Sequence, residues 1–89
     1  MAYIFNIEVS ATLEDSHLIS RILHFKEDLH RECFRAQDVS VSDPKAVDSA
    51  LMPVSFSVRS KAGLSRFTKL IKKSLAHHDV ASAIRITRC

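Results

Sequence analysis

Hydrophobic and polar positions alternate along several segments of the chain and follow a helical spacing along two others. Residues 3–9 (YIFNIEV) and 53–60 (PVSFSVRS) alternate most clearly, which predicts two strands that are each buried on one face. Residues 80–88 (VASAIRITR) predict a further strand, with Ile84 and Ile86 facing the core. These three segments share the period of two that is typical of a sheet covered on one side.

A fourth strand is expected over residues 34–42 (FRAQDVSVS), where the composition suits a strand but the pattern is irregular. Val39 and Val41 alternate out of step with Phe34 and Ala36. A bulge, or a position at the edge of the sheet, would explain this mismatch. The register of this strand therefore stays open.

The first helical pattern predicts a helix that begins near Leu13 and ends at about Arg31. Thr12 and Asp15 resemble a capping box, with Asp in place of the usual Glu. An apolar stripe at helical spacing follows, formed by Leu18, Ile22, Phe25 and Leu29. One face of this helix should therefore be buried.

Two more helical segments are predicted in the second half of the chain. Asp43 before Pro44 is a good pair for a helix cap and first position, which predicts a single helical turn in the long connection that follows residue 42. Gly63 marks a turn or the entry to a second long helix. The apolar stripe of that helix consists of Leu64, Phe67, Leu70, Ile71 and Leu75, with His78 as a further candidate.

The predicted order of elements is β-α-β-β-α-β, in a single domain over residues 1–89. Two βαβ halves joined in this way predict an α+β fold of the ferredoxin-like type, a four-stranded antiparallel sheet with two helices on one face. The strands at 3–9 and 53–60 should be central, because they are the most apolar. A chain of 89 residues has room for one modest hydrophobic core.

The net charge of +3 hides an asymmetry between the two halves of the chain. Residues 1–44 hold four Lys or Arg against eight Asp or Glu, whereas residues 45–89 hold nine against two. Charge pairing between the two packed helices would explain this division. A basic face offered to an acidic partner, or an ordinary solvated surface, would explain it as well.

The composition also bears on the compartment of the protein. No apolar run approaches the length of about 18 residues that a membrane span requires. The first residues lack the basic start and apolar core of an export signal, so we expect a cytoplasmic protein with no membrane span. Cys33 and Cys89 are expected to be free thiols, because two cysteines do not form a disulfide framework.

Several kinds of chemistry find little support in the sequence. The single glycine, Gly63, does not make a phosphate-binding loop. The histidines and cysteines lack the paired spacing of a metal site, and no histidine is placed by its spacing as a base for Cys33. The positions expected on the open sheet face carry no aromatic residue that could stack on RNA bases; they are Asn6, Glu8, Ser55, Ser57, Arg59, Arg85 and Thr87. We therefore expect no enzymatic activity, no cofactor and no metal site.

The pattern as a whole resembles the ACT and ACT-like regulatory domains. The likeness covers nearly the whole chain and is carried by FNIEV, HLISRIL, DVSVS, VSFSVRS and LSRFTKLIKKSLAHHDVASAIRI. A further likeness is to the ACT-like C-terminal tails of membrane proteins of the MgtC type. The resemblance implies a ligand loop between the first strand and the first helix, formed here by Thr12, Leu13, Glu14, Asp15, Ser16 and His17.

This loop departs from the pattern of the family. Typical members place a Pro-Gly or similar pair there and bind an amino acid or another small effector at an interface between two domains. Glu14 and Asp15 would repel a carboxylate, so amino-acid sensing of the usual kind is in doubt.

Two functions of different classes follow from these observations. The first is a non-enzymatic, ACT-like regulatory or interaction domain that pairs its sheet or a helix with a second copy, as a homodimer, or with a partner domain. The second is a nucleic-acid-binding module that uses the basic face of the second long helix, formed by Arg66, Lys69, Lys72 and Lys73.

Overall fold

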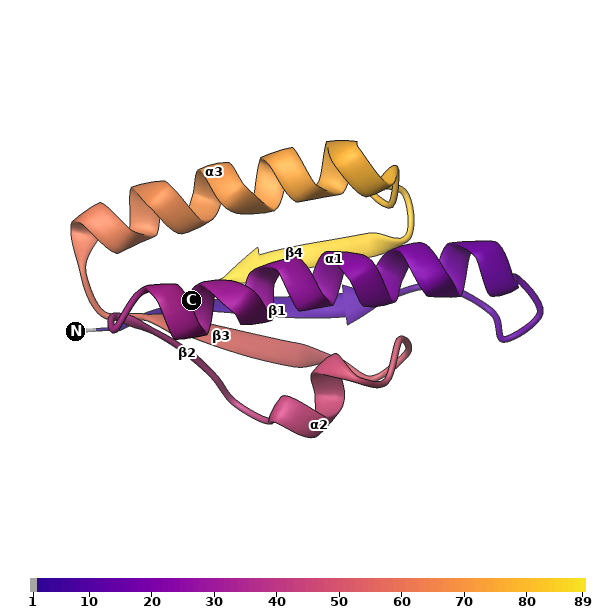
Figure 1. Ribbon diagram of the computed structural model, residues 1–89, viewed down its shortest axis with the longest axis horizontal. Coiled ribbons are helices and arrows are strands. Elements are labelled where there is room, and N and C mark those ends of the chain that lie inside the picture. Colours follow the sequence, from indigo (N-terminus) through magenta and orange to yellow (C-terminus); the bar gives the residue numbers. More distant parts are fainter. Residues whose placement is uncertain (1) are drawn as a thin grey trace.

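The computed structural model describes residues 2–89 and has the α+β layout that the sequence predicts, with a four-stranded antiparallel sheet and a βαββαβ order of its main elements. A single-turn helix is added in the middle connection. Figure 1 shows the two long helices packed side by side in front of the sheet. The elements in chain order are β1 (Tyr3–Val9), α1 (Ser16–Arg35), β2 (Val39–Val41), α2 (Pro44–Val47), β3 (Val54–Val58), α3 (Lys61–His78) and β4 (Ile84–Arg88).

The strands lie in the order β2-β3-β1-β4, and all neighbours are antiparallel. The prediction that β1 and β3 are central is confirmed. Phe5 of β1 pairs with Phe56 of β3, and Ile7 pairs with Ile86 of β4. Both edges of the sheet are therefore formed by the strands that end each half of the fold.

The hydrophobic core lies between the sheet and the two long helices. Phe67 of α3 packs on the two central strands, with ring centroids 5.2 Å from Phe5 and 5.5 Å from Phe56. All three rings are buried. Burial of each is worth about 1.5–3 kcal/mol, so this cluster is a main contributor to the stability of the fold.

The start of α1 differs from the prediction. The helix begins at Ser16 rather than near Leu13, because the Asp15 side chain accepts a hydrogen bond from the Leu18 N–H at 3.0 Å and so acts as the N-cap. The predicted capping box is wrong for the same reason: the Asp15 N–H donates to the Thr12 carbonyl at 3.3 Å, within a turn that precedes the helix.

The end of α1 corrects a second prediction. The helix continues past Arg31 to Arg35, so the predicted strand over residues 34–42 is reduced to Val39–Val41. Phe34 lies on α1 with 80% of its surface exposed. The irregular alternation thus arises because the segment contains a helix end followed by a short strand, and no bulge is needed.

The middle connection contains the helical turn that Asp43 and Pro44 predict. Asp43 caps α2 by accepting a hydrogen bond from the Lys45 N–H at 3.0 Å, and Pro44 is the first residue of the helix. Ala46 and Val47 are buried, so the turn closes one end of the core.

The helix α3 begins where its capping residues place it. Ser60 caps the helix by accepting a hydrogen bond from the Gly63 N–H at 2.9 Å. A Cβ at Gly63 would overlap the carboxylate of Asp38, so a larger residue here would displace that side chain from its bonds with Ser60 and Arg66. The predicted last strand is shortened to Ile84–Arg88, because residues 80–83 form a turn in which the Ala83 N–H donates to the Val80 carbonyl at 3.0 Å.

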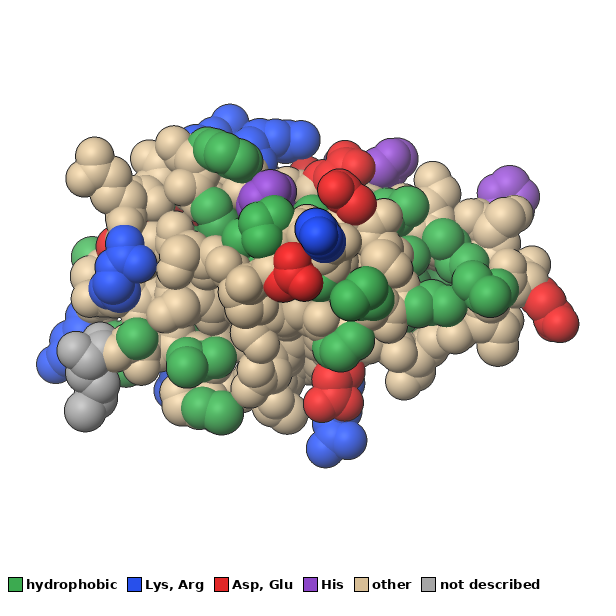
Figure 2. Space-filling model, turned by 90° about the horizontal axis from the view of Figure 1, so that it is seen from below, with side chains coloured by type: hydrophobic (Ala, Val, Ile, Leu, Met, Phe, Trp, Pro, Cys, Tyr) green, Lys and Arg blue, Asp and Glu red, His purple; other side chains and the backbone are tan. Residues whose placement is uncertain are grey.

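The surface on the side of α2 is mixed. Figure 2 shows hydrophobic side chains there in several separate groups among polar and charged ones. Within residues 2–89, no helix combines the length and the apolar character needed to cross a membrane.

Candidate functional site

A groove lies between α1 and α3. The two helices run in opposite directions, so Glu32 meets Arg66 near the start of α3 whereas Asp28 meets Ser74 farther along it. The groove has a volume of about 330 Å³. Its lining residues are Asp28, Arg31, Glu32, Arg35, Leu70, Lys73, Ser74 and His77.

Asp28 is the hydrogen-bonding centre of the groove. Its Oδ2 atom lies 2.6 Å from the Oγ of Ser74, which donates to it, and 2.6 Å from Nε2 of His78. Nη1 of Arg31 lies 3.4 Å from its Oδ1 atom. Burial raises the pKa of Asp28, but the hydrogen bonds from Ser74 and His78 and the charges of His78 and Arg31 outweigh it, so the net pKa is lowered.

This arrangement differs from that of a catalytic triad, in which a histidine lies between serine and carboxylate and takes the serine proton. Here the Ser74 hydroxyl donates to Asp28 directly, and His78 contacts the same oxygen. A carboxylate with a lowered pKa is a weak base. The cluster therefore holds α1 and α3 together rather than activating Ser74.

The histidines near Asp28 do not form a metal centre. The ring of His78 lies 6.0 Å from that of His24 and 4.8 Å from that of His77, measured between centroids. Across the described part of the chain, no three His, Cys, Asp or Glu side chains lie close enough together to hold a metal ion.

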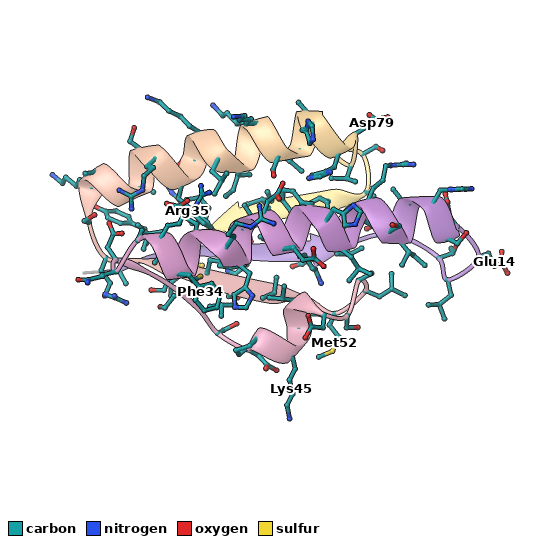
Figure 3. The ribbon with its side chains drawn as sticks, in the orientation of Figure 1. Glu14, Phe34, Arg35, Lys45, Met52 and Asp79 are labelled. Carbon is teal, nitrogen blue, oxygen red and sulfur yellow. The ribbon has the colours of Figure 1, made fainter. Side chains whose placement is uncertain are left out.

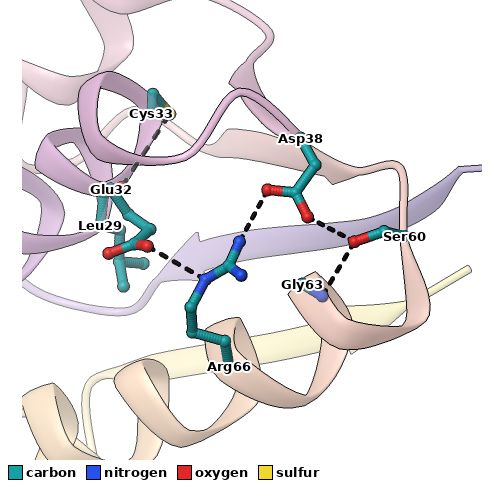
Figure 4. Close-up of polar contacts among 7 residues, drawn as sticks. All are labelled: Leu29, Glu32, Cys33, Asp38, Ser60, Gly63 and Arg66. Atoms are coloured by element: carbon teal, nitrogen blue, oxygen red, sulfur yellow. Dashed lines mark hydrogen bonds and ion pairs between the residues drawn. The ribbon is translucent and has the colours of Figure 1, made fainter.

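A second polar network lies near the start of α3 and joins Arg66 to Glu32 and Asp38 (Figure 4). Arg66 bridges the two halves of the fold: its Nε lies 3.2 Å from Glu32 Oε1, and its Nη2 lies 2.6 Å from Asp38 Oδ1. Asp38 also accepts a hydrogen bond from Ser60, the cap of α3. These bonds, led by the one from Ser60, lower the pKa of Asp38. The acidic first half and the basic second half are thus partly matched within the molecule.

The predicted basic face is divided by this network. Arg66 is committed to two carboxylates, whereas Lys69, Lys72 and Lys73 are exposed and form no ion pair among residues 2–89. Only Lys73 of the four lines the groove.

The predicted ligand loop lies apart from the groove. Its six residues are all exposed, and Leu13 has 78% of its surface exposed. Asp15 serves as the cap of α1, and Ser16 and His17 belong to the first turn of that helix. Figure 3 shows Glu14 at the far tip of the molecule, pointing away from the sheet.

Lys26 forms a third polar site, inside the core. Its side chain is fully buried, and its Nζ donates to the carbonyls of Ala46, Ser49 and Met52 at 3.0, 2.7 and 2.5 Å. Burial lowers the pKa of Lys26 to about 8. The lysine therefore fixes the connection between β2 and β3, because three carbonyls of that connection accept hydrogen bonds from its single amine.

Cys33 and Cys89 are free thiols, as predicted. Burial raises the pKa of Cys33, and the charge of Glu32 adds to this effect, against a smaller opposing backbone hydrogen bond. A thiol with a raised pKa is a poor nucleophile.

The open face of the sheet has a shallow hollow of about 140 Å³. It is lined mostly by serines, with Ile4, Val41 and Phe56 beside Ser40, Ser42, Ser55 and Ser57. Asn6 and Ser55 are joined across the strands, with Ser55 Oγ 2.6 Å from Asn6 Oδ1. This face therefore offers small hydroxyl groups rather than a stacking platform.

Sequence reasoning missed the pairing of Asp28 with Ser74 and the presence of Arg31 and Arg35 beside Lys73 in one groove. A polar residue inside an apolar helical stripe would have been the signal, since Ser74 lies between Ile71 and His78 on the buried side of α3. Comparison with protein-family models gives no match to this chain, and comparison with curated proteins gives none either.

Proposed function

We propose that this chain is a non-enzymatic, ACT-like regulatory or interaction domain that pairs its sheet with that of a second copy. The observation that carries the proposal is the outer edge of β4. This strand pairs with β1 on one side only, because it lies at the end of the sheet. The βαββαβ order supports the ACT-like assignment, and the Ser74 and Cys33 environments support a role without catalysis.

The hydrogen bonds of β4 define which backbone groups are left for a partner. The Cys89 N–H donates to the Ile4 carbonyl at 2.9 Å, and the Ala83 carbonyl accepts from the Ser10 N–H at 2.8 Å. The backbone N–H and C=O groups of Arg85 and Thr87, the odd-numbered residues of β4, thus point toward β1. The N–H and C=O groups of Ile84, Ile86 and Arg88 then point outward, because they alternate in an antiparallel ladder. Such unpaired groups are what an added strand binds.

The sequence of β4 suits pairing with itself. An antiparallel partner centred on Ile86 places Ile86 opposite its copy, Ile84 opposite Arg88 and Arg85 opposite Thr87. No two arginines lie directly opposite each other, so like-charge repulsion stays small. Within the sheet, Glu8 is already the cross-strand neighbour of Arg85, which offsets part of its charge.

The other edge of the sheet is less suited to this role. β2 has three residues, Val39–Val41, and leads at once into the connection that contains α2, so its free ladder is short. The surface beside α2 offers separate apolar groups rather than one continuous patch (Figure 2). These features support the β4 edge as the interface.

Sedimentation velocity at tens of micromolar protein tests the proposal. We expect a species of twice the 10.0 kDa chain mass. Arg88→Pro should shift it to the monomer, since proline removes an outward N–H while the ladder to β1 keeps its bonds. Arg88→Gln is the matched control, because it removes the charge and keeps the N–H. A monomer at all concentrations, or equal dimerisation of both variants, would contradict the proposal.

The proposal includes a candidate effector site at the loop before α1 and a cytoplasmic location. An effector at Thr12–His17 would produce saturable amide shifts there when labelled protein is titrated with pooled amino acids. If no pool produces shifts, the loop does not take part. The free thiols Cys33 and Cys89 suit a reducing compartment such as the cytoplasm.

A second candidate function is nucleic-acid binding by α3. It is favoured by the exposure of Lys69, Lys72 and Lys73, which are unpaired within residues 2–89. Affinity for RNA or DNA should then fall steeply as salt rises, and Lys69→Glu with Lys72→Glu should abolish it. Lack of binding to both at low salt removes this candidate.

A further inference from the structure

The groove between α1 and α3 holds more cationic groups than its own contacts use. Arg31 and Arg35 are one turn apart on α1, and Lys73, the neighbour of Ser74 on α3, lines the same groove. Figure 3 shows Arg35 on the side of α1 that faces α3. Arg35 and Lys73 form no ion pair among residues 2–89, and Arg31 has only its 3.4 Å contact with Asp28.

The two carboxylates of the groove are already occupied. Asp28 accepts hydrogen bonds from Ser74 and is in contact with His78, both at 2.6 Å. Glu32 is bound by Arg66 from the end of the groove at 3.2 Å. The lining carries three Lys or Arg side chains against these two carboxylates, so the hollow between the helices has a surplus of positive charge.

We propose that this groove binds a small organic phosphate, with Arg35 and Lys73 as the principal contacts and Arg31 as a third. Arginine binds phosphate through paired N–H donors, and lysine binds it as a point charge. Leu70 supplies an apolar wall for the organic part. The volume of about 330 Å³ lies at the lower end of the range for small-molecule sites, roughly 300–1,000 Å³.

A phosphate monoester fits the groove better than a carboxylate does. A phosphate dianion offers three acceptor oxygens and a charge of about −1.5 to −2 near neutral pH, which matches three cationic side chains. A single carboxylate would leave one or more of them without a counter-charge. The groove uses no residue of β4, so this proposal does not depend on sheet pairing.

Amide NMR titrations at constant ionic strength test the proposal with three probes: phenyl phosphate, inorganic phosphate and benzoate. We expect saturable shifts within residues 31–35 and 70–77. Phenyl phosphate should bind most tightly, because it supplies both the dianion and an apolar group for Leu70. Shifts that rise linearly without saturation, or equal binding of benzoate and phenyl phosphate, would overturn the proposal.

Variants then separate the groove from the general charge of the surface. Arg35→Gln and Lys73→Gln should each weaken phenyl phosphate binding about tenfold, since each removes one charge-assisted hydrogen bond. Lys69→Gln is the matched control: Lys69 is exposed on α3 but does not line the groove, so its loss should change affinity by less than about twofold. The amide spectrum of each variant reports whether it is folded.

Competition with single-stranded RNA distinguishes two sources of the same phosphate chemistry. If RNA does not displace phenyl phosphate from the groove, the small-molecule assignment stands. Equal loss of affinity in Lys69→Gln and Lys73→Gln, together with displacement by RNA, would show that the cations act as a diffuse surface for nucleic acid, and would overturn it.

Discussion

Lys26 and Asp28 lie two residues apart on α1, yet Lys26 is bonded by backbone groups in the core and Asp28 by side chains at the surface of a groove. Lys26 points to the connection between β2 and β3, where it is fully buried and donates to backbone carbonyls of residues 46, 49 and 52. Asp28 points to α3 and is bonded by the side chains of Ser74 and His78 at the wall of a groove.

The difference lies in what satisfies each charge. Lys26 is bonded by backbone carbonyls, which are held in place by the chain itself, so the Lys26 site is fixed as long as the connection is folded. Asp28 is bonded by side chains instead, and a quarter of its own side chain is exposed to solvent. One site is closed within the core, whereas the other lies at a groove that is open to solvent. The predictions below test this contrast.

The largest expected effect is that of Lys26→Met. Methionine has a similar length and fills the space, but it leaves the carbonyls of Ala46, Ser49 and Met52 without a donor. A buried carbonyl left unpaired costs about 1–3 kcal/mol; Ala46 is buried, whereas water can reach the partly exposed Ser49 and Met52, so the total should be about 2–4 kcal/mol. Urea unfolding measures the loss.

The control for this prediction is Lys45→Met, which changes the same side chain on the exposed surface of α2. Its free energy of unfolding should stay within about 0.5 kcal/mol of the wild type. A Lys26→Met protein as stable as the control would mean that the connection does not need the amine.

The second effect is a dependence on alkaline pH. The folded protein releases the Lys26 proton near pH 8, whereas the unfolded chain holds it up to about 10.5. Between these values the unfolded state binds more protons, so the free energy of unfolding rises with pH. The advantage of wild type over Lys26→Met should grow by up to about 1.4 kcal/mol per pH unit in this window. A constant gap would show that Lys26 titrates normally.

Much of this fold could be predicted from patterns that are local in sequence. The alternation in β1 and β3, and the Asp43-Pro44 pair that begins α2, depend on residues within one element and were read correctly. The ends of α1 were not. Asp15 could belong to a capping box with Thr12 or be the N-cap itself, and both patterns are local. Phe34 is an aromatic residue of the kind that favours strands, but it lies exposed on a helix.

The polar sites were harder to predict because their partners are distant in sequence. Ser74 and Asp28 are 46 positions apart, and Lys26 is 20 to 26 positions from its acceptors. A local signal did exist: Lys26 falls between Ile22 and Leu29 in the apolar stripe of α1. A polar residue in such a stripe indicates a buried partner, but the pattern alone does not identify it.

The third effect concerns the bond between α1 and α3. Asp28→Ala should lower the free energy of unfolding by about 1–2 kcal/mol, because it leaves the buried hydroxyl of Ser74 without its acceptor. Glu27→Ala is the matched control, since Glu27 is exposed and precedes Asp28 on the same helix. Thermal unfolding of both variants measures the difference. If both lose the same stability, the Asp28 bonds contribute nothing beyond the helix itself.

The smallest effect is the response of Asp28 to acid. Its folded pKa lies below the ordinary value of 3.8, so the unfolded chain binds this proton first as the pH falls. The stabilising contribution of Asp28 is therefore fully present above the ordinary pKa of 3.8 and is lost as the pH falls through the lower pKa of the folded state. Asp28 is a quarter exposed, so solvent screening should limit the contribution to about 0.5 kcal/mol.

The stability gap between wild type and Asp28→Asn should narrow over this range in urea unfolding. A gap that widens in acid would mean that Asp28 is protonated more readily in the folded protein, and that the bonds from Ser74 and His78 do not favour its charged form.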